Sequence, residues 1–362
     1  MFNNMNSPFK RSNLNLLIEL FKDSDRKSLF RMMYELVVLL IKYREIPVHY
    51  FSRFLFKKRI INFRDFLPNR LSGNITCFFN DSKEKEVLDN KLYFDLFYRQ
   101  FNINLPDILM YNDKNMFVVR NKSSEINSAH DFTVLLQDIF EQNSLYDSII
   151  IKKTNASSSG RNIYKLFVNQ IKTDHEILNK LFAEVIISEF LFEGTVRQHP
   201  DLNRLNSSCL NTMRLDTFID KDGKIEIISG YLRMSITNSH VDNISSGGCQ
   251  VGIVLETGKL KKYAFSHLIN LGVKELTEHP VTKTIFENLS VPFFHEAKEL
   301  VLKAASLKPS LRLIGWDVGI AESEPVLIEG NSDYAIAGND VAYGGYMANP
   351  IFRKVLHEIN YF

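Results

Sequence analysis

The chain has 362 residues, 45% of them hydrophobic and 24% charged, which is typical of a globular protein with two or three subdomains. Its three cysteines are scattered without a CxxC pair, which argues against a disulfide framework or a structural zinc site and favours a reducing, cytoplasmic location. The polar first residues contain no secretory signal, and the longest apolar stretch, Leu36–Ile41, is too short to span a bilayer.

The net charge of +2 is unevenly distributed along the chain. Residues 1–70 contain 14 Lys and Arg against 6 Asp and Glu, whereas the other 292 residues contain 30 against 36. A basic N-terminal region predicts peripheral contact with an anionic membrane or a glycolipid, and the alternative is an ordinary solvated helical face. The basic residues are not interleaved with aromatic residues as in RNA-binding motifs, so no nucleic acid partner is predicted.

Hydrophobic spacing predicts that the first part of the chain is mainly helical. Apolar residues three and four positions apart predict a helix over residues 13–43 and a further helix over Phe51–Arg59. A charged connector follows at Asp81–Glu86. Later segments with the helical pattern are Lys91–Phe101, Asp131–Asn143, His175–Val185, Ala297–Leu307 and Ile351–Phe362. From Asn211 onward strands and turns alternate, with hairpins predicted around Asp220–Lys224 and Thr257–Lys259.

A third hairpin is predicted over Leu311–Asn331, with a five-residue bend between its strands. In a regular antiparallel register, Ile320 faces Val326 and Asp317 falls directly opposite Glu329. Two carboxylates in this position repel each other, and partial burial raises the cost.

A bound cation would relieve this repulsion. Asn331 lies two residues beyond Glu329 and therefore points to the same face of the hairpin. Oxygen ligands from Asp317, Glu329 and Asn331 suit a hard ion such as Mg²⁺. The alternative that stays open is an exposed hairpin with solvated acids.

The stretch IIIKKTNASSSGRNIYKL contains a second candidate site. An apolar strand ends in Lys152 and Lys153, and a loop of small residues leads back into another strand. Small side chains let backbone N–H groups approach an anion, and lysine supplies a positive charge, so the pattern predicts a phosphate-binding hairpin. It is not the strand–loop–helix P-loop, and a flexible surface hairpin remains the alternative.

Three further polar stretches contain candidate ligand-binding residues. Arg214, next to Asn211 and Thr212, could bind a carboxylate or phosphate in bidentate fashion. Arg233 ends a strand before a polar, glycine-containing loop of the kind that covers sites. His279 precedes a proline, where a histidine is more often structural than catalytic. The nucleophile motif GxSxG and the zinc-protease motif HExxH are both missing from the sequence, and no cysteine has an identifiable catalytic partner, which argues against covalent catalysis by the protein.

The order of these stretches resembles the ATP-grasp superfamily. More narrowly, SCLNTMRLDT, VDNISSGGCQVGI, EHPVT and GWDVGI followed by VLIEGN resemble the sugar-transfer-associated ATP-grasp family over about residues 75–345. The resemblance implies an α+β chain with the ATP-grasp fold, in which two α/β subdomains grip ATP between antiparallel sheets. It also implies a helical basic region at residues 1–88, a central subdomain at 89–189 and a C-terminal subdomain with the metal site at 190–362.

The resemblance also implies a role for each candidate residue. Mg²⁺ would be held against the ATP phosphates by Asp317, Glu329 and Asn331. The expected ATP-binding residues are Lys91, Lys153, the loop Ser157, Ser158, Ser159 and Gly160, an adenine hinge of Glu189, Phe190 and Leu191, and Glu193 at the ribose. Charge on the transferring phosphoryl group would be neutralised by Arg214, Arg233 and Lys153. The expected substrate-binding residues are Asn211, Thr212, Asp242, Asn243, Gly247, Gly248 and His279.

The activity that the resemblance implies is amide formation. ATP would phosphorylate a carboxylate, and an amine would displace phosphate from the acyl phosphate, with a sugar acid or amino acid of surface-polysaccharide biosynthesis as the expected substrate. The alternatives are an ATP-grasp kinase acting on a hydroxyl, a non-catalytic ATP-binding partner of glycosyltransferases, and an unrelated peripheral membrane protein. The chain departs from the family pattern at Thr154, where proline is usual, in its serine-rich loop, and in the bend ESEP, which lacks Gly–Pro. A homodimer is compatible with these features.

Overall fold

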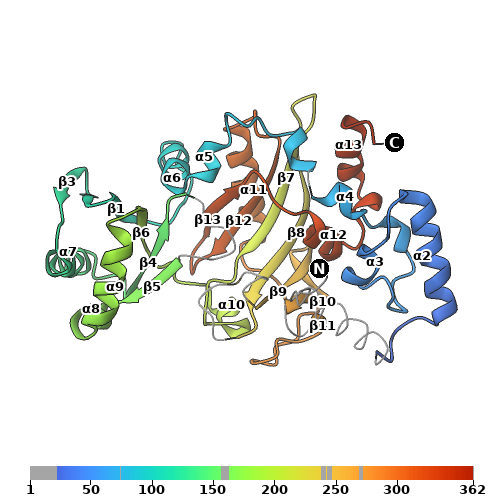
Figure 1. Ribbon diagram of the computed structural model, residues 1–362, viewed down its shortest axis with the longest axis horizontal. Helices are drawn as coiled ribbons and strands as arrows, with labels where there is room; N and C mark the ends of the chain where they lie inside the picture. The colour runs from blue at the N-terminus through green and yellow to red at the C-terminus, as the bar shows by residue number, and fades with distance from the viewer. Residues whose placement is uncertain are drawn as a thin grey trace, which may run out of the picture.

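The computed structural model describes residues 23–73, 75–155, 163–237, 242, 247–268 and 272–361, without the side chains of residues 267, 268 and 272–274. Its strands form two antiparallel sheets (Figure 1). The strands are β1 (Ile108–Asp113), β2 (Met116–Val119), β3 (Lys122–Glu125), β4 (Ser148–Lys153), β5 (Ile163–Phe167), β6 (Glu189–Gly194), β7 (Met213–Ile219), β8 (Ile225–Ser235), β9 (Gly248–Val254), β10 (Lys259–Leu268), β11 (Gly272–Leu276), β12 (Leu313–Ile320) and β13 (Pro325–Asn331). The predicted α+β class is confirmed.

Helices surround both sheets. The α-helices are α2 (Leu29–Tyr43), α3 (His49–Ser52), α4 (Asn69–Ser72), α5 (Glu86–Asp89), α6 (Lys91–Arg99), α7 (Ala129–Gln142), α8 (Val168–Thr173), α9 (His175–Val185), α10 (Pro200–Leu205), α11 (Phe294–Ser306), α12 (Ala337–Tyr343) and α13 (Pro350–Glu358), and the 3₁₀ turns are η1 (Phe63–Asp65), η2 (Ile75–Phe78) and η4 (Tyr346–Ala348). In the described part of the chain, none of them is both long and apolar enough to cross a bilayer.

The N-terminal helices are shorter than the sequence pattern predicts. Where one helix was expected over residues 13–43, α2 starts only after Ser28, whose hydroxyl accepts a hydrogen bond from the Arg31 backbone N–H. Residues before Asp23 lie outside the described part. The helix predicted over Phe51–Arg59 is wrong beyond α3, because Phe54 has a φ of 59° and this left-handed conformation ends the helix.

The smaller sheet has the strand order β3-β2-β1-β6-β4-β5, and α7, α8 and α9 lie beside it in Figure 1. Its core is rich in phenylalanine, as Phe117, Phe132, Phe190 and Phe192 are all fully buried. Since residues of a strand alternate between faces, the core positions Phe190 and Phe192 direct Leu191 and Glu193 to the opposite face of the sheet. That opposite face of β6 contributes to the cavity described below.

The larger sheet has the order β11-β10-β9-β8-β7-β12-β13, and its two faces belong to different hydrophobic clusters. Trp316 is fully buried on one face, in the cluster that includes α11, and its indole N–H donates to Thr217 at 2.8 Å. Leu313 lies on the other face, in the cluster that includes α13. Because β7 and β12 are covered on both faces, any charged residue in them has to find a partner.

The N-terminal helical region is joined to helix α12 by a buried ion pair. Arg53, which follows α3, pairs with Asp340 of α12. Asp340 also accepts hydrogen bonds from the backbone N–H groups of Leu67 at 2.9 Å and Tyr346 at 2.7 Å. Segments more than 270 residues apart in the chain are thereby joined at one carboxylate.

The predicted hairpin forms, with one irregularity. Asp317 lies opposite Glu329 as predicted, but Val318 pairs with Leu327 and Ile320 with Pro325. The predicted pairing of Ile320 with Val326 is therefore wrong, because Ile328 is an extra residue in β13 and shifts the register. This β-bulge lies directly beside the two carboxylates.

Candidate functional site

A cavity of about 330 Å³ lies between the two sheets. The smaller sheet contributes Ile150 and Lys152 of β4, Ile163 and Lys165 of β5, and the segment from Glu193 to Gln198 at the end of β6. The larger sheet and its neighbours contribute Thr212, Arg233, Asp242, Asp317, Ile328 and Glu329, and α6 contributes Lys91. Candidate residues that are far apart in the chain therefore meet in one place.

Asp317 is held by two arginines at the floor of this cavity. Arg214 Nε lies 2.5 Å from Asp317 Oδ1, and Arg233 Nη2 lies 2.7 Å from Asp317 Oδ2. The carboxylate is only 1% exposed. Burial alone would raise the pKa of Asp317, but the charges of Arg214 and Arg233 outweigh burial and hold its pKa well below the usual range. Asp317 is therefore ionised whenever the protein is folded at neutral pH.

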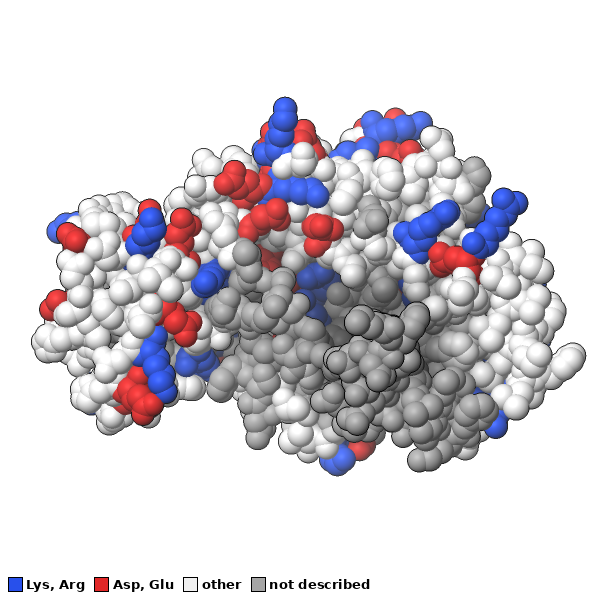
Figure 2. Space-filling view, in the orientation of Figure 1, with Lys and Arg blue, Asp and Glu red and all other residues white. Residues whose placement is uncertain are grey.

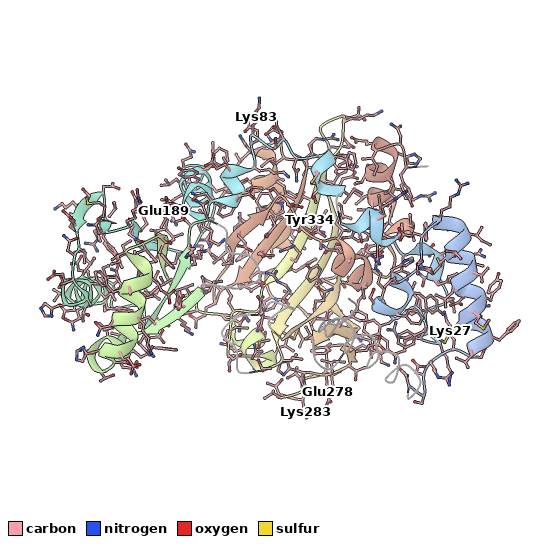
Figure 3. The ribbon with its side chains drawn as sticks, in the orientation of Figure 1. Lys27, Lys83, Glu189, Glu278, Lys283 and Tyr334 are labelled. Carbon is pink, nitrogen blue, oxygen red and sulfur yellow. The ribbon has the colours of Figure 1, made fainter. Side chains whose placement is uncertain are left out.

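Arg214 lies beneath Asp317 and is absent from the described cavity lining. Its guanidinium lies over the ring of Tyr334, 5.5 Å from the ring centroid (Figure 3 labels Tyr334). Burial opposes the charge on Arg214, but the neighbouring Asp317 raises its pKa well above the ordinary value. The structure therefore directs the charge of Arg214 at Asp317, and its role at the transferring phosphoryl group stays a prediction. Arg233 does line the cavity.

Glu329 and Asn331 lie next to Asp317. Asn331 Nδ2 is 3.4 Å from Asp317 Oδ2 and 3.5 Å from Glu329 Oε1, and Lys91 Nζ is 3.5 Å from Glu329 Oε2. The Lys91 backbone N–H donates to the carbonyl of Thr154 at 2.9 Å and so ties α6 to the end of β4.

The spacing and chemistry of these polar atoms can be compared with those of Mg²⁺ ligands. Cis ligands of an octahedral Mg²⁺ with bonds of about 2.1 Å lie about 3 Å apart, close to the spacing of these polar atoms. A rotation of the Asn331 amide would replace its nitrogen with its oxygen. Among the described residues, no three of His, Cys, Asp and Glu gather around a metal site, so the candidate set is two carboxylates and one amide. Its donor chemistry fits Mg²⁺. In the structure Glu329 pairs with Lys91, the Asn331 amide donates to the Gly315 carbonyl, and Asp317 is shared with two arginines.

A second ion pair lies in the wall formed by the smaller sheet. Lys152 Nζ is 2.8 Å from Glu193 Oε2, and both side chains are buried. Ile150 pairs with Glu193 in the ladder between β4 and β6, so Ile150, Lys152 and Glu193 share one face.

The third polar cluster joins Arg233 to Thr212 and Asp242. Arg233 donates to the Thr212 hydroxyl at 2.7 and 3.0 Å. The hydroxyl and backbone N–H of Thr212 both donate to Asp242 Oδ2, the latter at 3.0 Å. Arg233 is thereby oriented from two sides, by Asp317 and by the Thr212–Asp242 pair.

The charges of the cavity are balanced. Among its described lining residues, five cations (Lys91, Lys152, Lys165, Arg197 and Arg233) accompany five carboxylates (Asp147, Glu193, Asp242, Asp317 and Glu329). An anion that took a cation from its partner would leave a carboxylate unpaired, which is costly in a buried site. A polyanion that carries its own divalent cation avoids this cost, because the cation can neutralise the released carboxylates.

Two residues predicted to bind the nucleotide, Lys153 and Phe190, are not in the described cavity lining, because successive residues of a strand point to opposite faces of the sheet. Lys153 lies outside the described cavity lining, and its amine lies over the ring of Phe190, 5.7 Å from the centroid. The neighbouring Lys152 occupies the cavity instead. Phe190 belongs to the hydrophobic core, and Glu189 accepts a hydrogen bond from the Thr154 hydroxyl at 3.0 Å near the start of β6 (Figure 3).

Residues at the end of β6 line the cavity, and the residues of the predicted adenine hinge are not in its described lining. Glu193, Gly194, Thr195, Val196, Arg197 and Gln198 line the cavity, whereas Glu189, Phe190 and Leu191 do not appear in its described lining. The cavity lining on β6 therefore begins four residues after the start of the predicted hinge, at the end of the pairing of β6 with β1 and β4.

Several predicted substrate-binding residues have structural partners instead. The Asn211 backbone N–H donates to Gln198 Oε1 at 2.6 Å, and its side chain bonds to the carbonyls of Leu202 and Asn206. His279 is buried, its Nε2 lies 2.8 Å from the Ser235 carbonyl, and its Nδ1 accepts backbone N–H groups at 3.2 and 3.3 Å.

His279 therefore stabilises a turn through these hydrogen bonds, which is the structural role that is more common for a histidine before proline. Gly247 has a φ of 92° and Gly248 begins β9, and neither is found in the described cavity lining. Ser157, Ser158, Ser159, Gly160 and Asn243 lie outside the described residues.

The cavity also contains residues that the sequence pattern did not single out. Lys165 lies two positions after Ile163 on β5, so strand alternation could have identified it once Ile163 was placed. Gln198 and Cys209 lie in the irregular segments on either side of α10, which have no periodicity. Burial raises the pKa of the Cys209 thiol to about 12, so this cysteine is not a nucleophile at neutral pH.

Comparison with known proteins identifies what the chain is similar to. The model of the sugar-transfer associated ATP-grasp family matches residues 70–351. No curated protein sequence matches the chain.

Solved structures with a similar fold are distant from the chain in sequence. D-alanyl-alanine synthetase A from Vibrio cholerae is 14% identical with a TM-score of 0.45, over 76% of this chain and 65% of that one. An L-amino acid ligase from Bacillus licheniformis is 11% identical with a TM-score of 0.39, over 75% and 48%. N5-carboxyaminoimidazole synthetase from Staphylococcus aureus, complexed with ADP, is 10% identical with a TM-score of 0.41, over 74% and 52%. The chain therefore spans about half to two thirds of these proteins.

Proposed function

Because the chain belongs to the sugar-transfer associated ATP-grasp family and has the ATP-grasp fold, we propose that it is an ATP- and Mg²⁺-dependent ligase that joins a carboxylate to an amine. The carboxylate would belong to a sugar acid or an amino acid used in surface-polysaccharide biosynthesis. The observation that carries this proposal is the arrangement at Asp317, where two arginines, Glu329 and Asn331 meet on one side of a cavity whose other wall contains a buried lysine.

In this proposal the nucleotide lies between the two sheets. Ile150 and Ile163 provide apolar contact for the base, and the backbone from Glu193 to Val196 offers polar groups to its edge. Lys152 binds an oxygen of the phosphate chain, while Glu193 keeps the Lys152 amine in place at 2.8 Å. Lys91 approaches the phosphates from the opposite wall, beside Glu329.

Glu329 and Asn331, with Asp317, are the residues that would hold Mg²⁺. When bound, the ion supplies positive charge that withdraws electrons from the transferring phosphoryl group. Asp317 keeps Arg233 in a fixed orientation through the 2.7 Å contact. Arg233 is therefore positioned to stabilise negative charge as it develops, without the cost of reorientation during the reaction.

The reaction that these groups support proceeds in two steps. A carboxylate oxygen of the substrate attacks the γ-phosphorus, the bond to the bridging oxygen of ADP breaks, and an acyl phosphate forms. An amine then attacks the acyl carbon, phosphate leaves, and the nitrogen loses a proton to give the amide. Positioning and charge stabilisation account for the catalysis, which agrees with the unreactive Cys209 thiol.

ADP release from the purified protein tests this proposal. The protein is incubated with ATP, Mg²⁺ and panels of uronic acids, amino acids and amines, and ADP and the new product mass are measured. The expected result is ADP release that requires a carboxylate, with an amide mass when an amine is present. A phosphorylated hydroxyl formed without any amine would instead identify a kinase.

A further inference from the structure

Helix α2 carries apolar residues on two sides. Its inner side packs Met32, Leu39 and Tyr43 into a hydrophobic cluster with α3 and the turns that follow. Its outer side carries a second apolar row that is exposed to solvent: Phe30, Met33, Tyr34, Val37, Leu40 and Ile41. At 100° per residue these six positions fall on one side of the helix. Phe30 is 84% exposed and Ile41 is 72% exposed.

The apolar row does not end with the helix. The segment after α2 adds Ile46 and Val48, which are also exposed. A helix that is apolar on all sides is normally covered, and a contiguous exposed apolar patch normally marks an interaction surface. The outer side of α2 therefore has the properties of a docking face, which we define as the six residues of α2 named above.

Cations outnumber carboxylates around the docking face, where Glu45 follows Arg44 directly and Asp65 lies near Lys42. Arg31, Lys42 and Arg44 are exposed on α2 or directly after it. Lys42 Nζ donates to the Arg64 carbonyl at 2.9 Å, which places Arg64 at the same end of the helix. The single carboxylate between Leu29 and Arg44 is Glu35.

Glu35 does not reach the docking face. It is fully buried on the inner side, where it binds Lys27 at 2.7 Å and the Tyr50 hydroxyl at 2.8 Å (Figure 3 labels Lys27). Arg31 also reaches Glu35, at 2.7 Å, so two cations share one carboxylate. Figure 2 shows the end of the molecule at which α2 lies in Figure 1 as mainly uncharged, with Lys and Arg at its borders and an Asp or Glu group beside them at the upper border.

This charge pattern distinguishes between two possible binding partners of the docking face, a second copy of the chain and a lipid bilayer. A second copy docked by two-fold symmetry would bring Arg31, Lys42 and Arg44 of one chain towards the same cations of the other, which is unfavourable. Residues 1–22 are also net positive, with Lys10, Arg11 and Lys22 against Glu19. An anionic bilayer complements both properties of the surface, because its phosphates pair with the cations and its acyl region accepts the apolar side chains.

We propose that the docking face of α2 binds the surface of an anionic lipid bilayer. The 15-residue helix is about 22 Å long and lies parallel to the membrane plane, with Phe30 and Ile41 inserted between lipids. Arg31, Lys42 and Arg44 contact lipid phosphates. The protein is thereby held at the membrane surface. The membrane contact itself does not depend on the proposed ligase activity.

Vesicle co-sedimentation of the full chain tests the proposal. Vesicles of phosphatidylglycerol and phosphatidylcholine are compared with vesicles of phosphatidylcholine alone, at low and high salt. The test variant is Phe30→Ser with Ile41→Ser, and the matched control is Ile187→Ser with Ile285→Ser, two exposed apolar residues outside α2. The expected result is salt-sensitive binding to the anionic vesicles, reduced at least about tenfold in the test variant and unchanged in the control.

Other outcomes overturn the proposal. If the full chain does not sediment with anionic vesicles, or if test and control variants sediment equally, α2 is not a lipid-binding face. Light scattering adds a second readout, since a dimer that dissociates only in the Phe30→Ser and Ile41→Ser variant would assign the docking face to a second copy of the chain. Circular dichroism of each variant verifies that it is folded.

Discussion

Lys152 and Lys153 are neighbours in the chain, but only Lys152 is found in the described lining of the cavity. Lys152→Met should lower kcat/KM for ATP by about 10²–10³, because it removes a phosphate-binding charge and leaves Glu193 buried without its partner. Lys153→Met is the matched control and should change kcat/KM by less than about threefold. Steady-state kinetics with ATP as the varied substrate measures both values. Equal losses in the two variants would contradict the assignment of Lys152.

The ion pairs of Asp317 make a prediction about stability. Asp317→Asn removes the carboxylate nearest to the buried Arg214 and Arg233 and should lower the free energy of unfolding by about 3–5 kcal/mol at pH 7. The pKa of Asp317 is depressed in the folded protein, so its stabilisation is present above about pH 4 and is lost as the pH falls further. Urea unfolding between pH 7 and pH 3 should show a flatter acid slope for the variant. A variant with wild-type stability and an unchanged acid slope would show that the pairs do not stabilise the fold.

At the scale of elements, β12 and β13 determine the geometry of the site. Gly330 lies between Glu329 and Asn331, and a Cβ atom added there would be 2.9 Å from the Trp316 ring and 3.0 Å from Leu88. Gly330→Ala should therefore destabilise the protein by about 1–3 kcal/mol and displace the two ligand residues. Thermal unfolding measures the change. The control is Gly73→Ala, whose nearest neighbour is 3.9 Å away, and the prediction fails if both variants unfold at the wild-type temperature.

The sequence pattern predicted the β12–β13 hairpin and the pairing of Asp317 with Glu329, because alternation and turn residues are local signals. It did not predict the bulge at Ile328, since nothing in VLIEGN distinguishes an extra residue from a regular strand. For the same reason the sequence pattern predicted Lys153 as the phosphate-binding lysine, whereas Lys152 lines the cavity. A strand ending in two lysines has two faces, and only the position of β6 decides which face meets the cavity.

At the scale of the whole molecule, the N-terminal region makes stability depend on pH. His49 is fully buried, and neither of its ring nitrogens has a hydrogen-bond partner among the described residues. Burial and the nearby Arg53 lower the pKa of His49 to about 4. As the pH falls from about 6.5 to 4, the unfolded chain takes up a proton that the folded protein does not, so the free energy of unfolding falls by up to about 3 kcal/mol.

His49→Phe should remove that part of the pH dependence. Chemical unfolding of both proteins at pH 7, 6, 5 and 4 measures the difference in free energy, which should grow in favour of the variant as the pH falls. Parallel curves for the two proteins would contradict a neutral, buried His49.

The family and the α+β fold could be predicted because short polar motifs occur in a fixed order along the chain. The motifs and their order can be read without knowing how the side chains pack. The partners of Asn211 and His279 could not, because their hydrogen bonds are to backbone groups brought close only by the fold. Apolar spacing predicted a helix over residues 13–43, but the exposure of one apolar row of α2 is seen only in the structure, because it depends on which side the neighbouring segments cover.

The most direct test of the central claim is calorimetric binding of ATP, with and without Mg²⁺, to the wild-type protein and to Glu329→Gln. The predicted result is Mg²⁺-dependent binding by the wild type that weakens at least about tenfold in the variant, because a neutral amide at this position lacks the charge that holds the ion. Absence of nucleotide binding by the wild type, or equal Mg²⁺-dependent binding by both proteins, would contradict a metal–nucleotide site at Asp317, Glu329 and Asn331.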